Sequence, residues 1–330
     1  MEKFIVVSDL HIGIHKDDEI WLRQTESLFD QIRDTAVKKN IDNIIIAGDF
    51  FHERKTVNVA TMYRAYNILK SLSDFHIIIL IGNHDTYYKN QIDPNSLYVF
   101  SDLSNVQIID ELTVIDDAAF LPWTTEKVNI TEIRQKYLIS HIEIDGFPAT
   151  YKSNFFGGYD KNDFQHFEKV ISGHFHIPSN RGNILYCGAP FHLTFSDKGS
   201  TSGYYIFDKG KIRFVENQDY AKYVRVTTED VVDRKMIEGN MVSMNFVKDY
   251  GILGNNRKIE YMQSLNPLRL FPDFTNISVH TDISSTQEDL APVKSVKEIL
   301  HDYVSNIELP PHINGTTLLS IMEKMMNGGT

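Results

Sequence analysis

Five short apolar segments of this chain are each followed directly by side chains that can bind a metal ion. Each segment has the length and apolar character of a buried β-strand, and the residues after it include Asp, His or Asn. The segment ends are DLH at 9–11, GD at 48–49, GNHD at 82–85, SH at 140–141 and GHFH at 173–176. Because ligands bind beyond the carboxyl ends of strands in α/β sheets, these five endings can meet at one place in the fold.

The first ninety residues predict a parallel sheet with helices between its strands. Strands are expected at 3–10, 41–49 and 75–83, and amphipathic helices are expected at 17–40 and 57–72. Continuously apolar strands that alternate with helices indicate an α/β layer with parallel pairing.

The chain is rich in predicted strands from residue 106 onward. They are expected at 106–110, 113–123, 136–141, 169–174 and 183–188, followed by a hairpin over 203–217 that turns at Lys209-Gly210. We assign residues 1–219 to one catalytic domain. Residues 220–285 show a weaker pattern, and their short strands at 223–228, 241–247 and 276–282 predict a small α+β capping domain. Residues 286–330 are expected to form a polar linker and two amphipathic helices.

Composition narrows the class of protein. The single cysteine, Cys187, excludes an internal disulfide and a thiolate zinc site, and it indicates a reducing compartment. The longest apolar runs fall far short of the ~18 residues that a membrane span needs, so we expect a soluble cytoplasmic protein, in the host cytoplasm if the gene is carried by a phage. The net charge of −11 argues against binding nucleic acid by overall electrostatics.

Taken singly, these strand endings are weak signals. D-x-H places two side chains on one side of an extended backbone, G-D and G-N-H-D are also ordinary turn sequences, and an isolated histidine is usually structural. Together they predict a metal site with seven candidate ligands: Asp9, His11, Asp49, Asn83, His141, His174 and His176. This nitrogen and oxygen set suits Mn, Fe, Zn or Co better than Mg or Ca. Seven ligands are too many for one ion and suit two, and such a pair predicts phosphoester hydrolysis.

The same endings, with the second extended to GDFFH at 48–52, resemble those of the calcineurin-like metallophosphoesterases. Within that superfamily the chain is similar to the SbcD-type, or Mre, DNA nucleases, including phage recombination endonuclease subunits. His52 stands where protein phosphatases have an Asp-Arg pair, and CGAPFHLTFSD at 187–197 is similar to a segment that follows the last metal motif in SbcD, with Ala189 replacing the usual Ser. The resemblance implies a four-layer αββα sandwich with a small α+β capping domain and a C-terminal helical pair.

The resemblance also implies roles for individual residues. One ion is expected on Asp9, His11, Asp49 and His176, and a second on Asp49, Asn83, His141 and His174, with Asp49 as the bridge. His84 is expected to face the scissile phosphate and to protonate or stabilise the leaving oxygen. Asp85 is expected to orient His84 by accepting a hydrogen bond, and His52 to contact the phosphate or nucleotide from the opposite rim. Mn²⁺ is the favoured metal, with Mg²⁺, Fe²⁺, Zn²⁺ and Co²⁺ as alternatives.

The expected partners are DNA and an SMC-type ATPase similar to SbcC, which the C-terminal helices would bind. Those helices could instead simply cover the core. A homodimer through helices of the catalytic core is also implied. Candidate phosphate contacts are Arg54, Lys55, Arg257 and Lys258, against the alternative of ordinary solvated surface. Two other functions stay open: a phosphatase or phosphodiesterase for small substrates, and an inactive subunit that tethers the ATPase to DNA.

Overall fold

The computed structural model describes residues 2–124, 126–150 and 153–275. The chain divides into two compact units after Ser278, so all of these residues belong to the first unit. The strand predicted at 276–282, the linker and the two C-terminal helices lie outside the described residues. No helix within the described residues combines the length and the apolar character that a membrane span requires.

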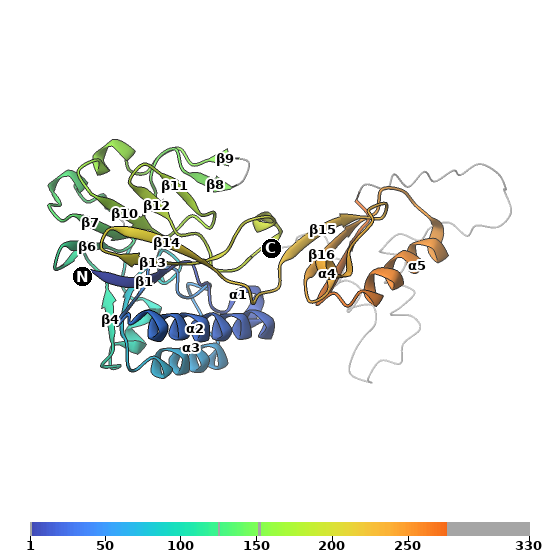
Figure 1. Ribbon diagram of the computed structural model, residues 1–330, viewed down its shortest axis with the longest axis horizontal. Coiled ribbons are helices and arrows are strands. Elements are labelled where there is room, and N and C mark those ends of the chain that lie inside the picture. The colour runs from blue at the N-terminus through green and yellow to red at the C-terminus, as the bar shows by residue number, and fades with distance from the viewer. Residues whose placement is uncertain (1, 125, 151–152, 276–330) are drawn as a thin grey trace, which may run out of the picture. The chain divides into compact units, whose positions relative to one another are not determined.

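A six-stranded sheet with the order β14-β13-β1-β2-β3-β4 forms the first half of the core (Figure 1). Its strands are β1 (Lys3–Val7), β2 (Asn43–Ile46), β3 (His76–Leu80), β4 (Val106–Ile109), β13 (Gly203–Asp208) and β14 (Lys211–Glu216). The pairs β1–β2 and β2–β3 are parallel, as predicted, the pair β3–β4 is parallel too, and β13 joins β1 in the antiparallel direction. Helices α1 (Ile14–Asp17), α2 (Glu19–Lys39) and α3 (Val59–Ser71) connect the first strands, and α2 and α3 lie side by side against one face of this sheet.

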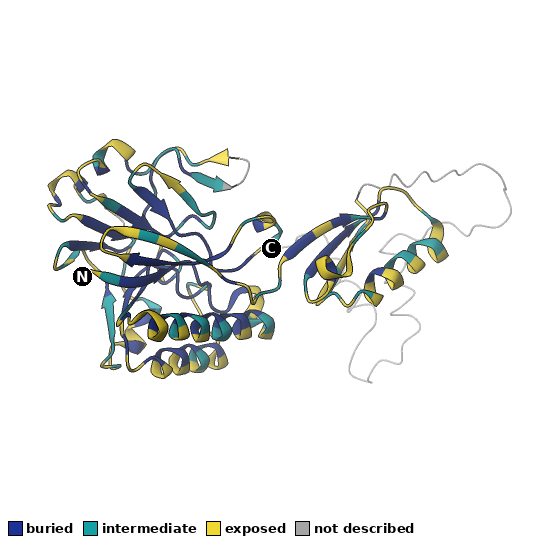
Figure 2. Cartoon of the chain, viewed as in Figure 1, coloured by how far each residue is buried: buried dark blue, intermediate teal, exposed yellow. Residues whose placement is uncertain are grey.

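A second six-stranded sheet has the order β11-β12-β10-β7-β6-β5. Its strands are β5 (Thr113–Ile115), β6 (Ala118–Leu121), β7 (Tyr137–Ser140), β10 (Lys169–Ser172), β11 (Ser179–Arg181) and β12 (Ile184–Tyr186). Apolar side chains of both sheets share one buried cluster, which includes Val6, Ile45, Ile139 and Ile171. Most of the strand residues in both sheets are accordingly buried or half-buried (Figure 2). The alternate residues of the strands pack away from this interface into separate clusters, as the period of two requires.

The predicted α/β sandwich is confirmed, with one difference in its outermost layer. Beyond the second sheet, Phe164 and Ile130 pack into a cluster with the outer face of the strands. The elements that carry them are the short 3₁₀ turns η2 (Ile130–Glu132) and η3 (Lys161–Phe164) rather than α-helices. Two further 3₁₀ turns are η1 (Ser96–Phe100) and η4 (Phe195–Asp197).

The segment 113–123 differs from its predicted single strand. It forms the hairpin of β5 and β6, with Asp116 in the left-handed conformation at the turn. An aspartate tolerates that conformation, and two consecutive acidic residues were the signal for the turn. The short two-stranded sheet of β8 (Pro148–Thr150) and β9 (Ser153–Asn154) was not predicted either.

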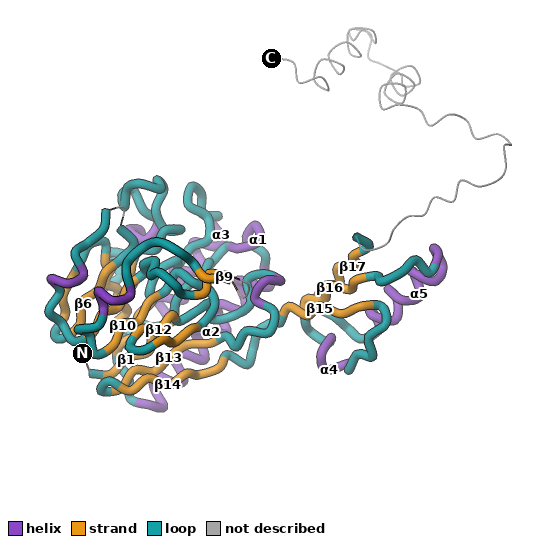
Figure 3. The backbone as a smooth tube through the Cα atoms, turned by 90° about the horizontal axis from the view of Figure 1, so that it is seen from above, coloured by secondary structure: helices purple, strands orange, loops and turns teal. Residues whose placement is uncertain are grey.

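Residues 223–273 form a small sheet and two helices around a cluster of their own (Figure 3). The elements are the parallel strands β15 (Tyr223–Thr227), β16 (Met241–Asn245) and β17 (Arg269–Asp273) and the helices α4 (Arg234–Ile237) and α5 (Gly251–Ser264). The strands at 223–228 and 241–247 were predicted, whereas the sequence of α5 indicates only polar loop. Only Met262 of α5 is buried, so its sequence lacks the apolar face that marks a helix.

Candidate metal centre

The seven predicted ligands converge at the carboxyl ends of β1, β2, β3, β7 and β10. Backbone hydrogen bonds hold the segment ends together, from Asp9 N to Gly48 O at 3.1 Å and from Gly173 N to Ser140 O at 3.0 Å. Strand pairs β1–β2–β3 and β7–β10 are parallel, so their ends point the same way within each sheet. The structure therefore brings together the five strand ends that the sequence pattern predicted to meet.

One set of ligand atoms gathers around His11. Its Nε2 lies 3.0 Å from His176 Nε2 and 3.5 Å from Asp49 Oδ2. Ligand atoms of Asp9, His11 and His176 all lie within 4.8 Å of one another. Two imidazole nitrogens and two carboxylates around one point are a donor set that suits a borderline divalent cation.

A second set gathers around Asn83 and the other oxygen of Asp49. The Nε2 of His141 lies 3.4 Å from Asp49 Oδ1 and 3.1 Å from Asn83 Oδ1, and His174 Nδ1 lies 2.9 Å from the same amide oxygen. The Nδ1 of His141 is 2.7 Å from the carbonyl oxygen of Ala47. A donor bond to that carbonyl leaves Nε2 with the lone pair that a metal ion needs.

Burial and neighbouring charges shift the pKa values of three residues in this centre. His11, Asp49 and His141 are at most 2% exposed. Burial lowers the pKa of His11 well below its ordinary value. Burial by itself raises the pKa of Asp49, but the neighbouring His141 outweighs it and holds that pKa well below the ordinary value. Burial lowers the pKa of His141, but Asp49 prevails and raises it to about 9. A buried carboxylate needs positive charge beside it, which bound cations would supply.

The backbone at the ligands adopts a conformation that L-residues usually avoid. Positive φ angles occur at Asp9 (54°), His11 (46°), Asp49 (51°) and His174 (90°). Such left-handed residues cost free energy and cluster at functional sites. The backbone at the strand ends therefore does not form relaxed turns. Its strained conformation directs the ligand side chains toward the centre.

Glycines allow the strand ends to approach closely. A Cβ atom at Gly173 would lie 1.9 Å from Ser8 Oγ and 2.3 Å from the carbonyl oxygen of Ala47. A Cβ atom at Gly82 would lie 2.1 Å from the backbone nitrogen of Asp49. Side chains at these two positions would thus push apart the segments that carry the ligands.

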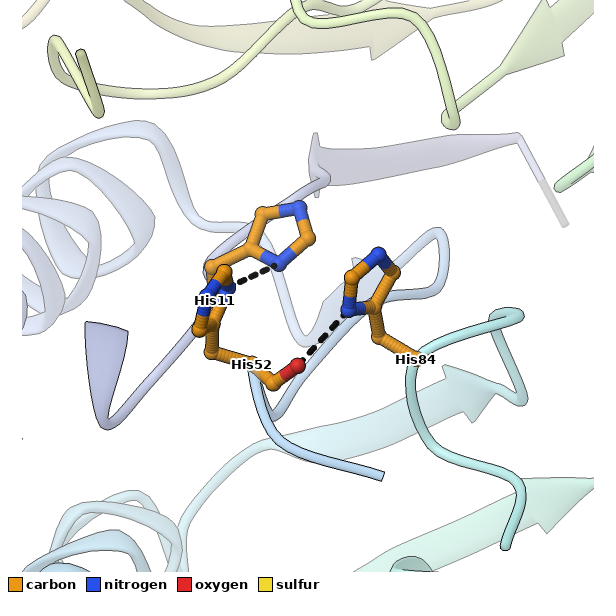
Figure 4. Close-up of side chains that lie close together, drawn as sticks. All are labelled: His11, His52 and His84. Atoms are coloured by element: carbon orange, nitrogen blue, oxygen red, sulfur yellow. Dashed lines mark hydrogen bonds between the residues drawn. The ribbon is translucent and has the colours of Figure 1, made fainter. Parts of the chain in front are cut away.

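His52 and His84 lie next to His11 (Figure 4). The Nδ1 atoms of His52 and His11 are 3.3 Å apart, and the ring of His52 stacks on that of His84 at 5.5 Å between centroids. His52 therefore lies beside His84, and its predicted position on the opposite rim is wrong. The reason is that the loop after β2 folds back over the loop after β3. Burial, followed by the charge of His84, lowers the pKa of His52.

The predicted hydrogen bond between His84 and Asp85 is also wrong. The Nδ1 of His84 instead lies 2.7 Å from the carbonyl oxygen of His52, and its backbone N–H donates to Asp49 Oδ1 at 2.8 Å. The buried carboxylate of Asp85 accepts the backbone N–H groups of Gly82 and Phe51, at 2.8 and 2.9 Å, and of Phe50 at 3.2 Å. Asp85 thus joins the loops after β2 and β3 instead of orienting the imidazole.

Two residues beside His174 were missed from the sequence. Glu143 Oε1 lies 3.1 Å from His174 Nε2, and the ring of Trp123 stacks on the imidazole with 5.6 Å between centroids. Glu143 follows His141 by two residues in an extended segment, which was the available signal for a shared face. No spacing marked Trp123, because it comes from the end of a different strand.

The four candidate DNA contacts have different surroundings. Arg54 is half-buried and Lys55 is exposed, and both line a surface depression of about 280 Å³. Arg257 is exposed on α5. Lys258 is half-buried on the same helix, where its ammonium donates to the carbonyl oxygen of Thr228 at 2.9 Å and lies over the ring of Tyr250.

The fold and the paired ligand sets define a metallophosphoesterase. The sequence profile of the calcineurin-like phosphoesterase family matches residues 2–190, and the chain belongs to this family, as its strand endings predicted. The chain is 28% identical to exonuclease subunit 1 of Enterobacteria phage T4, over 92% of this chain and 93% of that protein. It is 23% identical to the D component of the SbcCD nuclease of Staphylococcus epidermidis, over 72% of each chain. It is 31% identical to the DNA double-strand break repair protein Mre11 of Saccharolobus solfataricus, over 45% of this chain and 33% of that protein.

Proposed function

We propose that this protein is a DNA nuclease subunit that hydrolyses phosphodiester bonds with two divalent cations. The observation that carries the proposal is the position of Asp49, whose Oδ2 lies 3.5 Å from His11 Nε2 and whose Oδ1 lies 3.4 Å from His141 Nε2. A carboxylate shared between two ligand sets is what a pair of cations ~3.5–4 Å apart requires. The names of two relatives support a nuclease, and the name of the third supports DNA as the substrate and repair as the setting.

The two ligand sets follow from the distances. We assign one cation to Asp9, His11, Asp49 and His176, and the other to Asp49, Asn83, His141 and His174. The mixed nitrogen and oxygen donors favour Mn²⁺, with Fe²⁺, Zn²⁺, Co²⁺ and Mg²⁺ as alternatives. When bound, such a pair supplies a nucleophile at neutral pH and stabilises charge on the phosphoryl group.

The protein's own contribution to the reaction centres on His84. Its Nδ1 lies 2.7 Å from the carbonyl oxygen of His52, and a donor bond to that oxygen leaves Nε2 as the nitrogen that can carry and release a proton. The backbone N–H of His84 also donates to the bridging Asp49, which fixes the imidazole relative to the centre. We assign His84 to protonate or stabilise the leaving oxygen, help that is typically worth ~10²–10⁴-fold.

A nuclease assay tests the proposal. End-labelled duplex and single-stranded DNA are incubated with the purified chain and Mn²⁺ or Mg²⁺, with and without an SMC-type ATPase similar to SbcC. A nitrophenyl phosphodiester is the comparison substrate. We expect cleavage of DNA that EDTA abolishes. Hydrolysis of the nitrophenyl ester without cleavage of DNA would instead favour the small-substrate esterase. Hydrolysis of neither substrate would favour the inactive tethering subunit.

We propose a homodimer through α3. Its exposed apolar side chains Val59 and Tyr63 are 84% and 67% exposed, and Val99 of η1 beside them is 56% exposed. Together they line a depression of about 380 Å³, and apolar patches of this kind mark interfaces. Sedimentation at increasing concentration tests this. Tyr63→Glu should shift the protein to monomers, and Val37→Glu on α2, also exposed, is the control.

An SMC-type ATPase similar to SbcC is the proposed partner, with residues 286–330 as its binding segment. Residues 220–285 are the proposed capping domain, with Arg257 as its phosphate contact. The assay with the ATPase gene product tests this pairing, because a subunit that gains DNA affinity from its partner should cleave faster in the pair. Deleting residues 286–330 should remove the stimulation while basal cleavage continues.

A further inference from the structure

A pocket of about 280 Å³ opens beside the second ligand set and has no part in the mechanism above. Its lining includes the rings of Trp123 and Tyr159, the side chains of Lys89 and Lys127, and the carboxylate of Glu143. Aromatic rings and cationic side chains therefore lie around one small pocket. The pocket thus has the chemistry of a ligand site.

Trp123 and Glu143 connect this pocket to the candidate metal centre. The Trp123 ring is nearly parallel to the imidazole of His174, with 5.6 Å between centroids and 20° between planes. Glu143 Oε1 lies 3.1 Å from His174 Nε2, while His174 Nδ1 lies 2.9 Å from Asn83 Oδ1. The imidazole of His174 therefore lies between this pocket and Asn83 of the second ligand set.

The indole of Trp123 has an unused donor. Its backbone N–H donates to the carbonyl oxygen of Ile81 at 2.8 Å, which fixes the residue, but its buried Nε1 has no acceptor among the described residues. The hydroxyl of Tyr159, by contrast, accepts the backbone N–H of Val128 at 2.9 Å. Buried indole N–H groups normally have a partner, so this donor stands out as unsatisfied within the described residues.

The charges around the pocket favour an anionic ligand. Lys89 and Lys127 are both exposed, on a chain whose net charge is −11. The Lys127 ammonium donates to the carbonyl oxygen of Gly158 and lies 5.5 Å from the centroid of the Tyr159 ring. Glu143 is the one carboxylate in the lining, and it is engaged with His174. A ligand in which a planar ring is attached to a negatively charged backbone would fit the aromatic rings and the cationic side chains of this pocket.

We propose that the pocket binds one nucleotide of the strand being cut, next to the scissile phosphate. Its base lies against Trp123, and its own phosphate lies near Lys89 and Lys127. This inference rests on the proposed nuclease function. It specifies that the enzyme recognises one nucleotide of the substrate in addition to the scissile phosphate. Every base has a face that can stack on an indole, so the recognition tolerates any sequence and selects DNA over small phosphodiesters.

Fluorescence tests the binding without catalysis. The chain has two tryptophans, so the variant Trp21→Phe leaves Trp123 as the only indole emitter. A short single-stranded oligonucleotide, added in EDTA, should quench this emission. An abasic oligonucleotide of the same length should bind on the order of ten-fold more weakly, because it cannot stack. Equal binding of the two, or no quenching by either, would overturn the proposal.

Kinetics provide the second test. In Trp123→Ala we expect the ratio of kcat/KM for DNA to that for a nitrophenyl phosphodiester to fall on the order of ten-fold, mainly through KM, and Trp123→Phe should restore it. Lys127→Ala should lower the ratio more than Lys161→Ala, since Lys161 is exposed and does not line this pocket. A parent protein that cleaves neither substrate contradicts the nuclease function. Normal cleavage with an unchanged ratio in Trp123→Ala contradicts the pocket alone.

Discussion

Asp49, the proposed bridge, shows how single residues shape the candidate centre. Asp49 has a positive φ of 51°, is 2% exposed and accepts a hydrogen bond from the His84 backbone. A left-handed non-glycine residue costs on the order of 1–2 kcal/mol. The chain carries that cost at Asp49 and at three other proposed ligands. Such strain persists only where surrounding contacts hold it, so the contacts around these residues maintain the ligand geometry.

Replacing the bridge should empty the centre. In Asp49→Ala both ligand sets lose a carboxylate oxygen, and His141 loses the charge that raises its pKa to about 9. We expect the bound Mn²⁺ to fall from about two ions per chain toward none, measured by elemental analysis after dialysis. Asp208→Ala is the control, because Asp208 is exposed and pairs with Lys3 at the end of β1 opposite to Asp9. Two ions still present in Asp49→Ala would exclude the bridging role.

Replacing His84 should separate catalysis from metal binding. Its imidazole belongs to neither ligand set and is held by the carbonyl oxygen of His52. His84→Ala should therefore keep both ions and lose ~10²–10⁴-fold in kcat on DNA. Turnover and metal content are measured on the same preparation. A matching loss of metal would mean that His84 is a ligand.

At the scale of elements, the strand ends meet because two of the connecting residues are glycines. The segment after β10 crosses the segments after β1 and β2 at Gly173, where no room exists for a side chain. Gly82 plays the same role between β3 and the Asp49 backbone. The sheets supply the direction of the strands, and these glycines set how closely their ends approach.

A methyl group at Gly173 should therefore destabilise the fold. It would lie 2.3 Å from the carbonyl oxygen of Ala47, a backbone atom that cannot rotate away. We expect Gly173→Ala to lower the free energy of unfolding by about 3 kcal/mol, at the upper end of the cost of overpacking. Gly182→Ala, where nothing lies within 4 Å but φ is +63°, should cost about 1–2 kcal/mol. Urea unfolding of the metal-free proteins measures both, and equal costs would contradict the close approach.

The sequence predicted the elements that carry the site better than those around it. The strands β1, β2, β3, β7 and β10 were predictable because most of their residues are apolar and are buried on both faces of the sheet. Helix α5 was not, because only one of its residues is buried. The seven ligands share one signal, a polar residue at a strand end. The contacts of Asp85 and His52 depend on how two loops fold over each other, which no local pattern records.

At the scale of the whole molecule, the candidate centre lies where the two sheets meet. Asp9, Asp49 and Asn83 follow strands of the first sheet, whereas His141 and His174 follow strands of the second. Apolar packing joins the sheets elsewhere, through the cluster that includes Phe4 and Ile171. Cations bound by both groups of ligands would therefore join the sheets at a buried polar edge, where apolar packing is replaced by charged side chains.

Removing the metal should thus weaken the fold as well as the activity. A cation present at a hundred times its dissociation constant stabilises the folded state by about 2.7 kcal/mol, which EDTA should remove. We expect a lower Tm in EDTA than in Mn²⁺, and faster hydrogen exchange in the segments after β2, β3, β7 and β10, measured by mass spectrometry. The Asp49→Ala protein is the control, since its Tm should not respond to Mn²⁺. Protection gained only at distant surface segments would indicate that the ions bind elsewhere and that the two sheets are held by apolar packing alone.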